Sequence, residues 1–461
     1  MQKSVRPTLG FMAVGLGTLA APLDSAVNIA FPSITAAFGL AVEDIRFVII
    51  AYVLTHSSLM LVCGKLGDLL GYRRIFVTGL CVSAVAFAAC SLATSLEWLL
   101  AGRVLQGVGI ALTLSCGPAL ATSLYDEAER TRVLSAYAAI AAVGSALGPL
   151  VGGILVEHFG WSVVFWARVP LMMVALLLSF TIPAGARPGT MRGFDGLGAV
   201  LLVAWSSTSL LAIAAHSTPL GVGLQIGLAV ASFAAIWAFI VRARAHPSPV
   251  VRPALFRDSR FVGMNLAAIV VQFAAFSIML LVPFWLAKTA GLTAGAGGLV
   301  LCLAAVGTVA GAWVAGRIAV RVGAGPLAVS GILVSMLGLA GISTWTADTT
   351  VLPMAAALIV QGLGLGLFQV AYTDLVIATL PLEERGVAGS LTMVTRTIGV
   401  VSAATGLSAA HRTFEGVALA AGQSASEAFV TGFQTTFRGV AVALGLGLIF
   451  ALISMRSRQV P

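Results

Sequence analysis

Charged residues are scarce in this chain, at 9% of its 461 residues, whereas soluble globular domains carry roughly 25%. Hydrophobic residues make up 59% of the sequence, and the mean hydropathy is +1.03. Apolar runs of about 20 residues, the length of a helix that spans a bilayer, follow one another with short gaps. The scarcity of charge excludes a soluble domain and predicts an all-α integral membrane protein.

Cysteine and histidine are also rare, with five residues of each. Every cysteine stands alone in an apolar run, without the paired spacing of disulfides or metal sites. The phosphate-binding pattern GxxxxGK followed by Ser or Thr is absent. We therefore expect no metal, no cofactor and no step driven by ATP, and we expect that the chain is not an enzyme.

Basic residues are unevenly distributed between the predicted loops. If the N-terminus is cytoplasmic, nineteen Lys and Arg residues fall in inner loops and tails, and three fall in outer loops. The outer three are Arg46, Lys288 and Arg412. By the positive-inside rule, this predicts a multi-pass protein of a cell membrane, such as a bacterial inner membrane, with both termini cytoplasmic. It also accounts for the net charge of +9 without a nucleic-acid partner.

An internal repeat organises the apolar runs. The heptapeptide QGVGIAL that begins at Gln106 returns as QGLGLGL at Gln361, 255 positions later. Gly64 recurs as Gly316, 252 positions later, within a similar basic segment. Because the matching segments keep their order, we predict a parallel duplication of a six-helix unit.

The repeat and the apolar runs together predict fourteen transmembrane helices, in two six-helix bundles plus two additional helices between them. Residues 1–184 form the N-terminal bundle and residues 260–461 the C-terminal bundle, while residues 185–259 hold the two extra helices and a basic cytoplasmic segment. Parallel bundles of this kind place a substrate pathway between them, near the bilayer midplane. We expect transport by alternating access; a duplicated scaffold that moves nothing is the alternative.

A glycine-rich and basic segment, GKLGDLLGYRR, follows the second apolar span. Its residues of interest are Gly64, Asp68, Gly71, Arg73 and Arg74. The glycines let helix backbones approach closely, and the acid can stabilise the N-terminus of the next helix. An ordinary positive-inside loop would explain the arginines but neither the glycine spacing nor the acid.

Asp24 is an acid inside the first apolar span, LGTLAAPLDSAVNIAF. A carboxylate at the bilayer centre costs about 2.5–3.5 kcal/mol, so an intramembrane Asp indicates a functional site. Span four, AGRVLQGVG, places Arg103 inside the bilayer, with Gln106 one turn further along the same face. A buried arginine also requires a partner.

Span five contains GSALGPLVGG, in which small residues permit tight helix packing and a proline weakens the helix. Its residues of interest are Gly144, Gly148, Pro149 and Gly152. We expect this segment to take part in conformational gating, together with the segment that follows span two.

These motifs, with LDSAVNIAFP in the first span and WSVVFWARVP at the start of the sixth, resemble the fourteen-span drug/proton antiporter branch of the major facilitator superfamily. The resemblance implies a proton-coupled exporter of small amphiphilic molecules. It also implies that Asp24 pairs with Arg103, since helices one and four line the central cavity in that family. Two positions depart from the family pattern: Arg168 replaces a small polar residue such as Asn, and Val320 stands where the first loop motif has Asp68.

Asp24 is the acid best placed to carry a proton through such a cycle. In this hypothesis it loses its proton when the cavity faces the cytoplasm, is then held by Arg103, and regains a proton from outside in competition with substrate. Asn28, one helical turn away, would line the same cavity. A permanent ion pair between Asp24 and Arg103 that only fixes helix packing is the alternative.

Polar side chains in other spans are candidates for the substrate cavity. Besides Asn28 and Gln106, they are Arg168, Gln361, Gln369, Tyr372, Asp374, Thr392 and Arg396. Polar packing between helices explains the glutamines and the tyrosine equally well, and Asp374 is either a cavity group or a solvated helix end. Arg168 and Arg396 either snorkel and bind carbonyls or face the cavity. If they face it, the cavity is net positive and favours anionic or neutral amphiphiles over quaternary cations.

The expected partners are a small-molecule substrate, protons and membrane lipid, and we expect a monomer. Two other functions stay open, because the same fold serves solute facilitators and proton symporters, and a membrane scaffold would transport nothing. The span-five motif argues against import, since it marks antiporters in the family that the sequence resembles.

Overall fold

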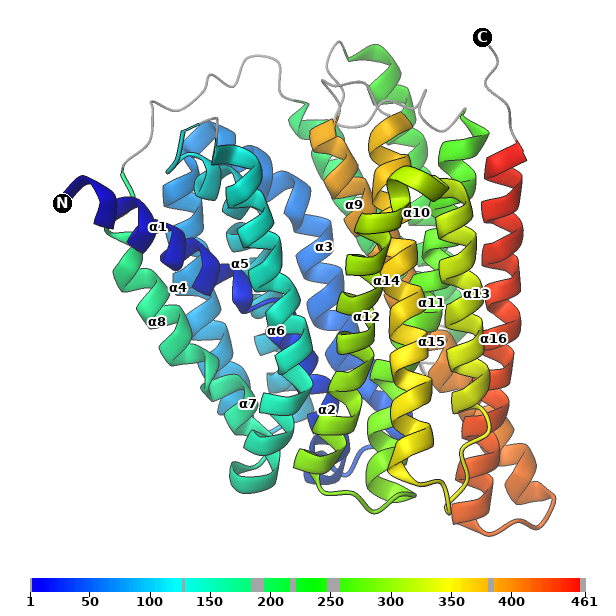
Figure 1. Ribbon diagram of the computed structural model, residues 1–461. Coiled ribbons are helices and arrows are strands. Elements are labelled where there is room, and N and C mark those ends of the chain that lie inside the picture. The colour runs from blue at the N-terminus through cyan, green and yellow to red at the C-terminus, as the bar shows by residue number, and fades with distance from the viewer. Residues whose placement is uncertain are drawn as a thin grey trace. The chain divides into compact units, whose positions relative to one another are not determined.

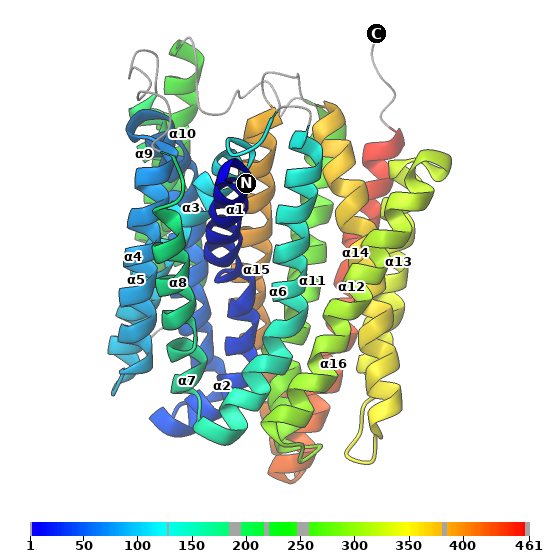
Figure 2. The same cartoon turned by 60° about the vertical axis from the view of Figure 1, so that its left-hand side comes forward.

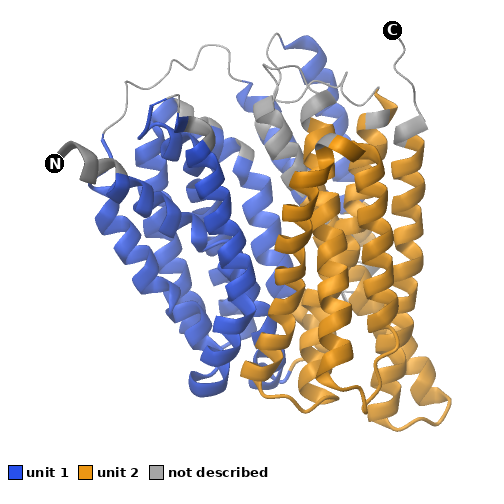
Figure 3. Cartoon of the chain, viewed as in Figure 1, with its two compact units in different colours: residues 1–39, 47–209, 228–250 blue, residues 40–46, 210–227, 251–461 orange. Residues whose placement is uncertain are grey.

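The computed structural model describes residues 2–126, 129–183, 195–215, 221–246, 258–379 and 385–456. These residues form helices and the turns between them, and none of the described residues lies in a β-strand. Figures 1 and 2 show the helices from two directions. The chain forms two compact units, with residues 1–39, 47–209 and 228–250 in unit 1 and residues 40–46, 210–227 and 251–461 in unit 2 (Figure 3). The prediction of an all-α protein is confirmed.

Unit 1 contains the first eight α-helices and parts of the next two. In chain order the elements are α1 (Gln2–Leu19), η1 (Pro22–Asp24), α2 (Ser25–Phe38), α3 (Ile45–Leu70), α4 (Tyr72–Ser91), α5 (Leu96–Thr122), α6 (Arg130–Phe159), α7 (Ser162–Trp166), α8 (Arg168–Ser179), α9 (Gly196–Ala215) and α10 (Gly221–Ala245). The division between the units falls within α9, within α10 and at the start of α3.

The first apolar span is broken, although the sequence predicts one helix over residues 10–32. α1 ends at Leu19, the single 3-10 turn η1 follows, and α2 begins at Ser25. Pro22 has no N–H to donate to the preceding turn, so the α-helical hydrogen-bond ladder cannot continue through it. The expectation of an unbroken helix is thus corrected, and Asp24 lies at the break between two helices.

The segment GKLGDLLGYRR is mostly helical rather than a loop. α3 continues to Leu70 and α4 begins at Tyr72, so only Gly71 separates the two helices. Gly71 has a φ of 94°, a left-handed conformation that favours glycine. The sharp turn between α3 and α4 therefore depends on this glycine.

Unit 2 is built on the second copy of the repeat. Its elements are η2 (Val42–Asp44), α11 (Ser259–Lys288), α12 (Ala294–Val322), α13 (Ala324–Ile342), α14 (Val351–Thr379), α15 (Arg385–Ala420) and α16 (Ala425–Arg456). Trp285 near the end of α11, Trp345 just beyond α13 and Phe433 near the start of α16 pack together, with ring centroids 5.0–6.1 Å apart. This aromatic cluster packs α11, α16 and the residue just beyond α13 together, at the end of unit 2 where α16 begins.

Equivalent helix contacts recur in the two units. Gly109 of α5 packs so closely on Ser83 of α4 that a Cβ there would collide with it. Gly364 of α14 packs in the same way on Ser335 of α13. The two glycines are 255 positions apart and the two serines 252, the spacings of the sequence repeat. The glycines of QGVGIAL and QGLGLGL therefore serve close helix packing.

The described residues contain eleven segments that are long and apolar enough to cross a membrane. Many of the large apolar side chains on them face outward, as in a protein whose surface meets lipid rather than water. The chain is a multi-pass membrane protein. The eleven segments are fewer than the fourteen that the sequence predicts.

Candidate functional site

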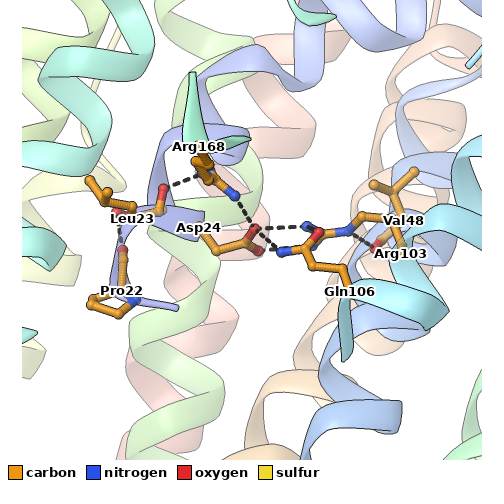
Figure 4. A network of polar contacts seen from close by, with 8 residues as sticks. Pro22, Leu23, Asp24, Val48, Arg103, Gln106 and Arg168 are labelled. Atoms are coloured by element: carbon orange, nitrogen blue, oxygen red, sulfur yellow. Dashed lines mark hydrogen bonds and ion pairs between the residues drawn. The ribbon is translucent and has the colours of Figure 1, made fainter. Parts of the chain in front are cut away.

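Asp24 receives four hydrogen bonds at the break between η1 and α2 (Figure 4). Arg103 donates from Nη1 to Oδ1 at 2.7 Å and from Nη2 to Oδ2 at 2.9 Å. Gln106 Nε2 and Arg168 Nη1 each donate to Oδ1 at 2.9 Å. We call these four residues the Asp24 cluster. It joins the first span to α5 and α8, all within unit 1.

Arg103 is held by a second set of contacts besides its bonds to Asp24. Its Nε donates to the carbonyl oxygen of Val48 in α3 at 3.1 Å, and its Nη1 donates to Gln106 Oε1 at 2.8 Å. The guanidinium carbon lies 4.4 Å from the ring centroid of Tyr52, within the range of a cation–π interaction. These contacts fix the plane of the guanidinium so that both of its terminal nitrogens meet the carboxylate.

Arg168 joins the cluster from the first position of α8. Its Nη2 donates to the carbonyl oxygen of Leu23 in η1 at 2.7 Å. Its guanidinium carbon lies 5.3 Å from the ring centroid of Phe87. Arg168 therefore binds both a carbonyl oxygen and the Asp24 carboxylate.

The Asp24 cluster contains more positive than negative charge. The side chains of Arg103 and Arg168 are only 2% and 4% exposed, whereas that of Asp24 is 14% exposed. Charges removed from water are stable only when they are paired and hydrogen-bonded. One carboxylate here satisfies two guanidiniums, so the cluster has a net charge of +1 when Asp24 is ionised.

The glycine motif of α6 packs directly on the break that carries Asp24. Added Cβ atoms would press Gly144 against Pro22, Gly148 against Ser25 and Gly152 against Ala26. Ser25 Oγ also donates to the carbonyl oxygen of Ser145, at 3.4 Å. Pro149 is buried within α6, which stays continuous from Arg130 to Phe159. The span-five motif thus fits the backbone around Asp24, which spacing in the sequence did not indicate.

The end of α3 and the start of α4 hold several of the residues that the sequence predicts to act in gating. Gly64 faces Ser115 at an ordinary contact distance, with 3.9 Å to an added Cβ. Arg73 is half-buried and Arg74 is exposed at the start of α4. The side chain of Asp68 lies outside the described residues.

A polar cluster in unit 2 joins three helices through Asn265 of α11. Tyr372 Oη of α14 and Thr395 Oγ1 of α15 both donate to Asn265 Oδ1, each at 2.9 Å. Asn265 Nδ2 donates to the carbonyl oxygen of Phe261 at 2.8 Å. Tyr372 is among the candidates that the sequence indicates, but Asn265 is not. The signal for Asn265 is that it is one of two amides in an apolar span.

Among the described side chains, those of Asn28, Gln369, Asp374 and Gln361 do not hydrogen-bond to either polar cluster. Asn28 and Gln369 are half-buried, Asp374 and Arg396 are exposed, and the side chain of Thr392 lies outside the described residues. Gln361 is buried, and the bare Cα of Gly338 in α13 lies against it. Its carbonyl oxygen accepts a hydrogen bond from Ser335 Oγ at 3.3 Å. Gln361 thus lies in the contact between α13 and α14.

Known proteins resemble this chain in sequence and in fold. The family model described as Major Facilitator Superfamily matches residues 14–404. A riboflavin transporter of Clostridioides difficile (strain 630) is 25% identical over 385 residues, covering 83% of each chain. A tetracenomycin C resistance and export protein of Streptomyces glaucescens is 29% identical over 402 residues, covering 86% of this chain and 74% of its own. Among solved structures, an auto-inhibited peptide transporter of the POT family matches with a TM-score of 0.71 at 16% identity, covering 99% of this chain and 98% of its own.

Proposed function

Because this chain belongs to the major facilitator superfamily and is a transporter rather than an enzyme, we propose that it exports small amphiphilic molecules in exchange for protons. Export is supported by relatives such as the tetracenomycin C resistance and export protein and a methylenomycin A resistance protein of Streptomyces coelicolor. The relatives also include a riboflavin transporter, so their names point to no single substrate, and the proposal names none.

The proposal includes a fourteen-span topology with both termini in the cytoplasm. Three helices are long enough to be added to the eleven apolar segments: α3 with 26 residues, α9 with 20 and α15 with 36. At 1.5 Å per residue each of them reaches about 30 Å or more, the thickness of the hydrocarbon core. The chain would then act as a monomer in a bacterial cell membrane, with α9 and α10 as the two additional helices.

The proton site of this proposal is Asp24. The observation that carries it is the set of four hydrogen bonds that an acid inside an apolar span receives from two arginines and a glutamine. That arrangement stabilises the carboxylate and supports an ionised Asp24, the form that the proposal requires after the proton has left. Proton uptake then requires that Asp24 separate from at least one guanidinium, and this separation would couple protonation to movement of α5 or α8.

The glycine motifs provide the gating part of the proposal. Because α6 contacts Pro22, Ser25 and Ala26 through bare glycines, a change at η1 must be accompanied by sliding of α6. The turn at Gly71 would let α3 and α4 move as a hinge. Protonation at Asp24 is thereby linked to helix movement through direct contacts.

The charge of the Asp24 cluster supports a preference in substrate. All acceptor positions that Asp24 offers to the cluster are directed at arginine or glutamine, so a cationic substrate would have to displace a guanidinium. An anionic or neutral amphiphile faces no such competition and can be attracted by the excess positive charge. We therefore propose that anionic or neutral molecules are transported in preference to quaternary cations.

The test is transport by the purified protein in proteoliposomes under an imposed pH gradient, with a panel of lipophilic compounds screened for counterflow. The wild-type chain should accumulate at least one compound when the gradient is present and lose that accumulation when it is collapsed. Asp24→Asn should fail to respond to the gradient, whereas Asp348→Asn, which alters an exposed acid, should behave like the wild type. Gradient-driven accumulation by Asp24→Asn would remove the proton role of Asp24.

A further inference from the structure

His411 is a buried titratable residue in unit 2 that the proposed function does not use. It lies on α15, beyond the apolar run 387–408, and its side chain is 1% exposed. Within the described part of the chain, neither Nδ1 nor Nε2 has a hydrogen-bond partner. A neutral imidazole has one donor and one acceptor, and buried polar groups in proteins are nearly always satisfied. The unsatisfied ring therefore indicates a function or a second state.

The surroundings of His411 form a close-fitting pocket for its ring. The ring of Phe429 in α16 meets it edge to face, with 5.0 Å between the centroids. Gly432, one turn further along α16, lies so close that an added Cβ would be 2.8 Å from Nδ1. Any larger residue at that position would push the imidazole out. The titratable ring of His411 is thus packed between Phe429 and Gly432 without a hydrogen bond to either of its nitrogens among the described residues.

Charged groups approach His411 from two helices. On α15 itself, Glu415 Oε2 lies 4.0 Å from His411 Nε2, and Glu415 is 28% exposed. On α11, Lys288 Nζ lies 5.4 Å from the ring centroid of Phe429 and acts electrostatically on both His411 and Glu415. From η2, Glu43 acts on Glu415.

No charged group approaches His411 from α16 among the described residues. Phe429 and Gly432 are the residues of that helix that touch the ring. Glu427 is exposed, and its carboxylate is engaged by Ser424 at 2.7 Å. The partially exposed Glu415 is thus the acid nearest to the buried imidazole, and it connects the ring with water.

We propose that His411 and Glu415 form a second proton-binding pair, at the end of unit 2 where α16 begins. The inference rests on the proposed function, in which this end faces outward and protons enter from it. A proton from bulk water would bind His411 Nε2 while Glu415 stays ionised, so the net charge of the pair changes from −1 to 0. The imidazolium would then draw Glu415 from 4.0 Å to hydrogen-bonding distance.

Protonation at this pair would change the packing of α15 on α16. His411 and Glu415 both lie against Gly432, since an added Cβ would be 3.1 Å from the backbone nitrogen of Glu415. Closing the pair therefore moves groups that already touch α16 without free space. Lys288 opposes protonation because it is a like charge, so its position would set how readily the pair takes up a proton.

The test observes the imidazole directly, by NMR of the full chain labelled with ¹⁵N-histidine in lipid nanodiscs. The chain has five histidines, and the signal that disappears in His411→Gln is that of His411. As the pH falls from about 8 to about 3, this signal should shift from neutral to protonated imidazole. Glu415→Gln should lower the midpoint by about one pH unit and Lys288→Gln should raise it. Glu427→Gln, the matched control on α16, should leave it unchanged.

A His411 signal that stays neutral throughout this range, or a midpoint that is insensitive to both Glu415→Gln and Lys288→Gln, would overturn the proposal. A transport measurement separates this failure from failure of the proposed function. His411→Gln should keep gradient-driven exchange but change its dependence on external pH, whereas Asp24→Asn should lose exchange at every pH. An unchanged external pH profile in His411→Gln would count against the pair even if exchange itself is proton-driven.

Discussion

Arg168 Nη1 lies 2.9 Å from Asp24 Oδ1, the same oxygen that Arg103 Nη1 binds at 2.7 Å. A second guanidinium thus binds the same carboxylate oxygen. The other terminal nitrogen of Arg168 donates to the Leu23 carbonyl oxygen in η1 at 2.7 Å. This arginine gives the Asp24 cluster its excess positive charge.

Replacing Arg168 with Asn should shift substrate preference toward cations. The substitution leaves Arg103 and Asp24 as a neutral pair and removes the excess positive charge. We expect the ratio of anionic to cationic dye export to fall by about tenfold, which corresponds to ~1.4 kcal/mol. The control is Arg132→Asn, which removes an arginine whose side chain is 87% exposed. A wild-type preference for the cationic dye, unchanged by Arg168→Asn, would contradict the proposed role of this charge.

Enlarging Gly148 should disturb the helix break that holds Asp24. A valine at this position would collide with Ser25, so α6 must move away from η1 and α2. Overpacking of this kind costs typically 1–3 kcal/mol, and we expect a lower thermal stability together with reduced transport. Gly223→Val is the matched control, because an added Cβ at Gly223 meets nothing within 4 Å. Equal effects of the two substitutions would argue against specific packing of the span-five motif.

Removing the Asn265 side chain should take away an acceptor that two buried hydroxyl groups share. Asn265→Ala would deprive Tyr372 Oη and Thr395 Oγ1 of hydrogen bonds, at a cost of about 1–3 kcal/mol. Adding Tyr372→Phe should then destabilise the protein less than it does in the wild type, because the shared bond is already gone. Thermal unfolding of the two single variants and the double variant measures this coupling. Strictly additive effects would mean that the contact contributes nothing.

The ion pair of Asp195 and Arg242 should make stability depend on pH. Burial opposes ionisation of Asp195, but the Gly198 N–H at 2.9 Å and the Arg242 guanidinium at 3.0 Å outweigh it and lower the pKa of the carboxyl. A lowered folded-state pKa adds stability above the unfolded pKa of about 3.9, and this stability is lost as pH falls through the folded pKa. Asp195→Asn should therefore be less stable than the wild type at neutral pH.

The stabilities of Asp195→Asn and of the wild type should also be compared at acidic pH. As the pH falls from about 3.9 through the lower folded-state pKa, the thermal unfolding temperatures of the wild type and of Asp195→Asn should converge, because the wild-type carboxyl then becomes neutral as well. The exposed Asp348 serves as the control, and Asp348→Asn should follow the wild type at each pH. A difference between Asp195→Asn and the wild type that is the same at all pH values would exclude the ionic contribution.

The sequence predicts the helical class and the repeat well because both depend on composition and spacing. The pairs Gly109–Ser83 and Gly364–Ser335 follow directly from the two offsets. The break at η1 was not predicted, although Pro22 is its cause, because proline is often tolerated in transmembrane helices when neighbouring helices satisfy the freed groups.

The contacts of individual polar residues were harder to predict. The sequence marks Arg168 as unusual but does not predict its partners. Its side chain binds Asp24 and the Leu23 carbonyl oxygen because η1 places both beside it, which is a property of the fold. Asn265 is not predicted, because it is one of two amides in an apolar span and their spacing matches no known motif. The functional roles of the Asp24 cluster stay a prediction until they are measured.

The most direct measurement of the central claim is proton movement during transport, recorded with a pH-sensitive dye enclosed in proteoliposomes. When a transported compound is added with no gradient imposed, the wild-type protein should move protons opposite to the compound. Asp24→Asn should still bind the compound, as followed by fluorescence titration, yet move no protons with it. Proton movement by Asp24→Asn in the same ratio to the compound as in the wild type would show that another group carries the proton.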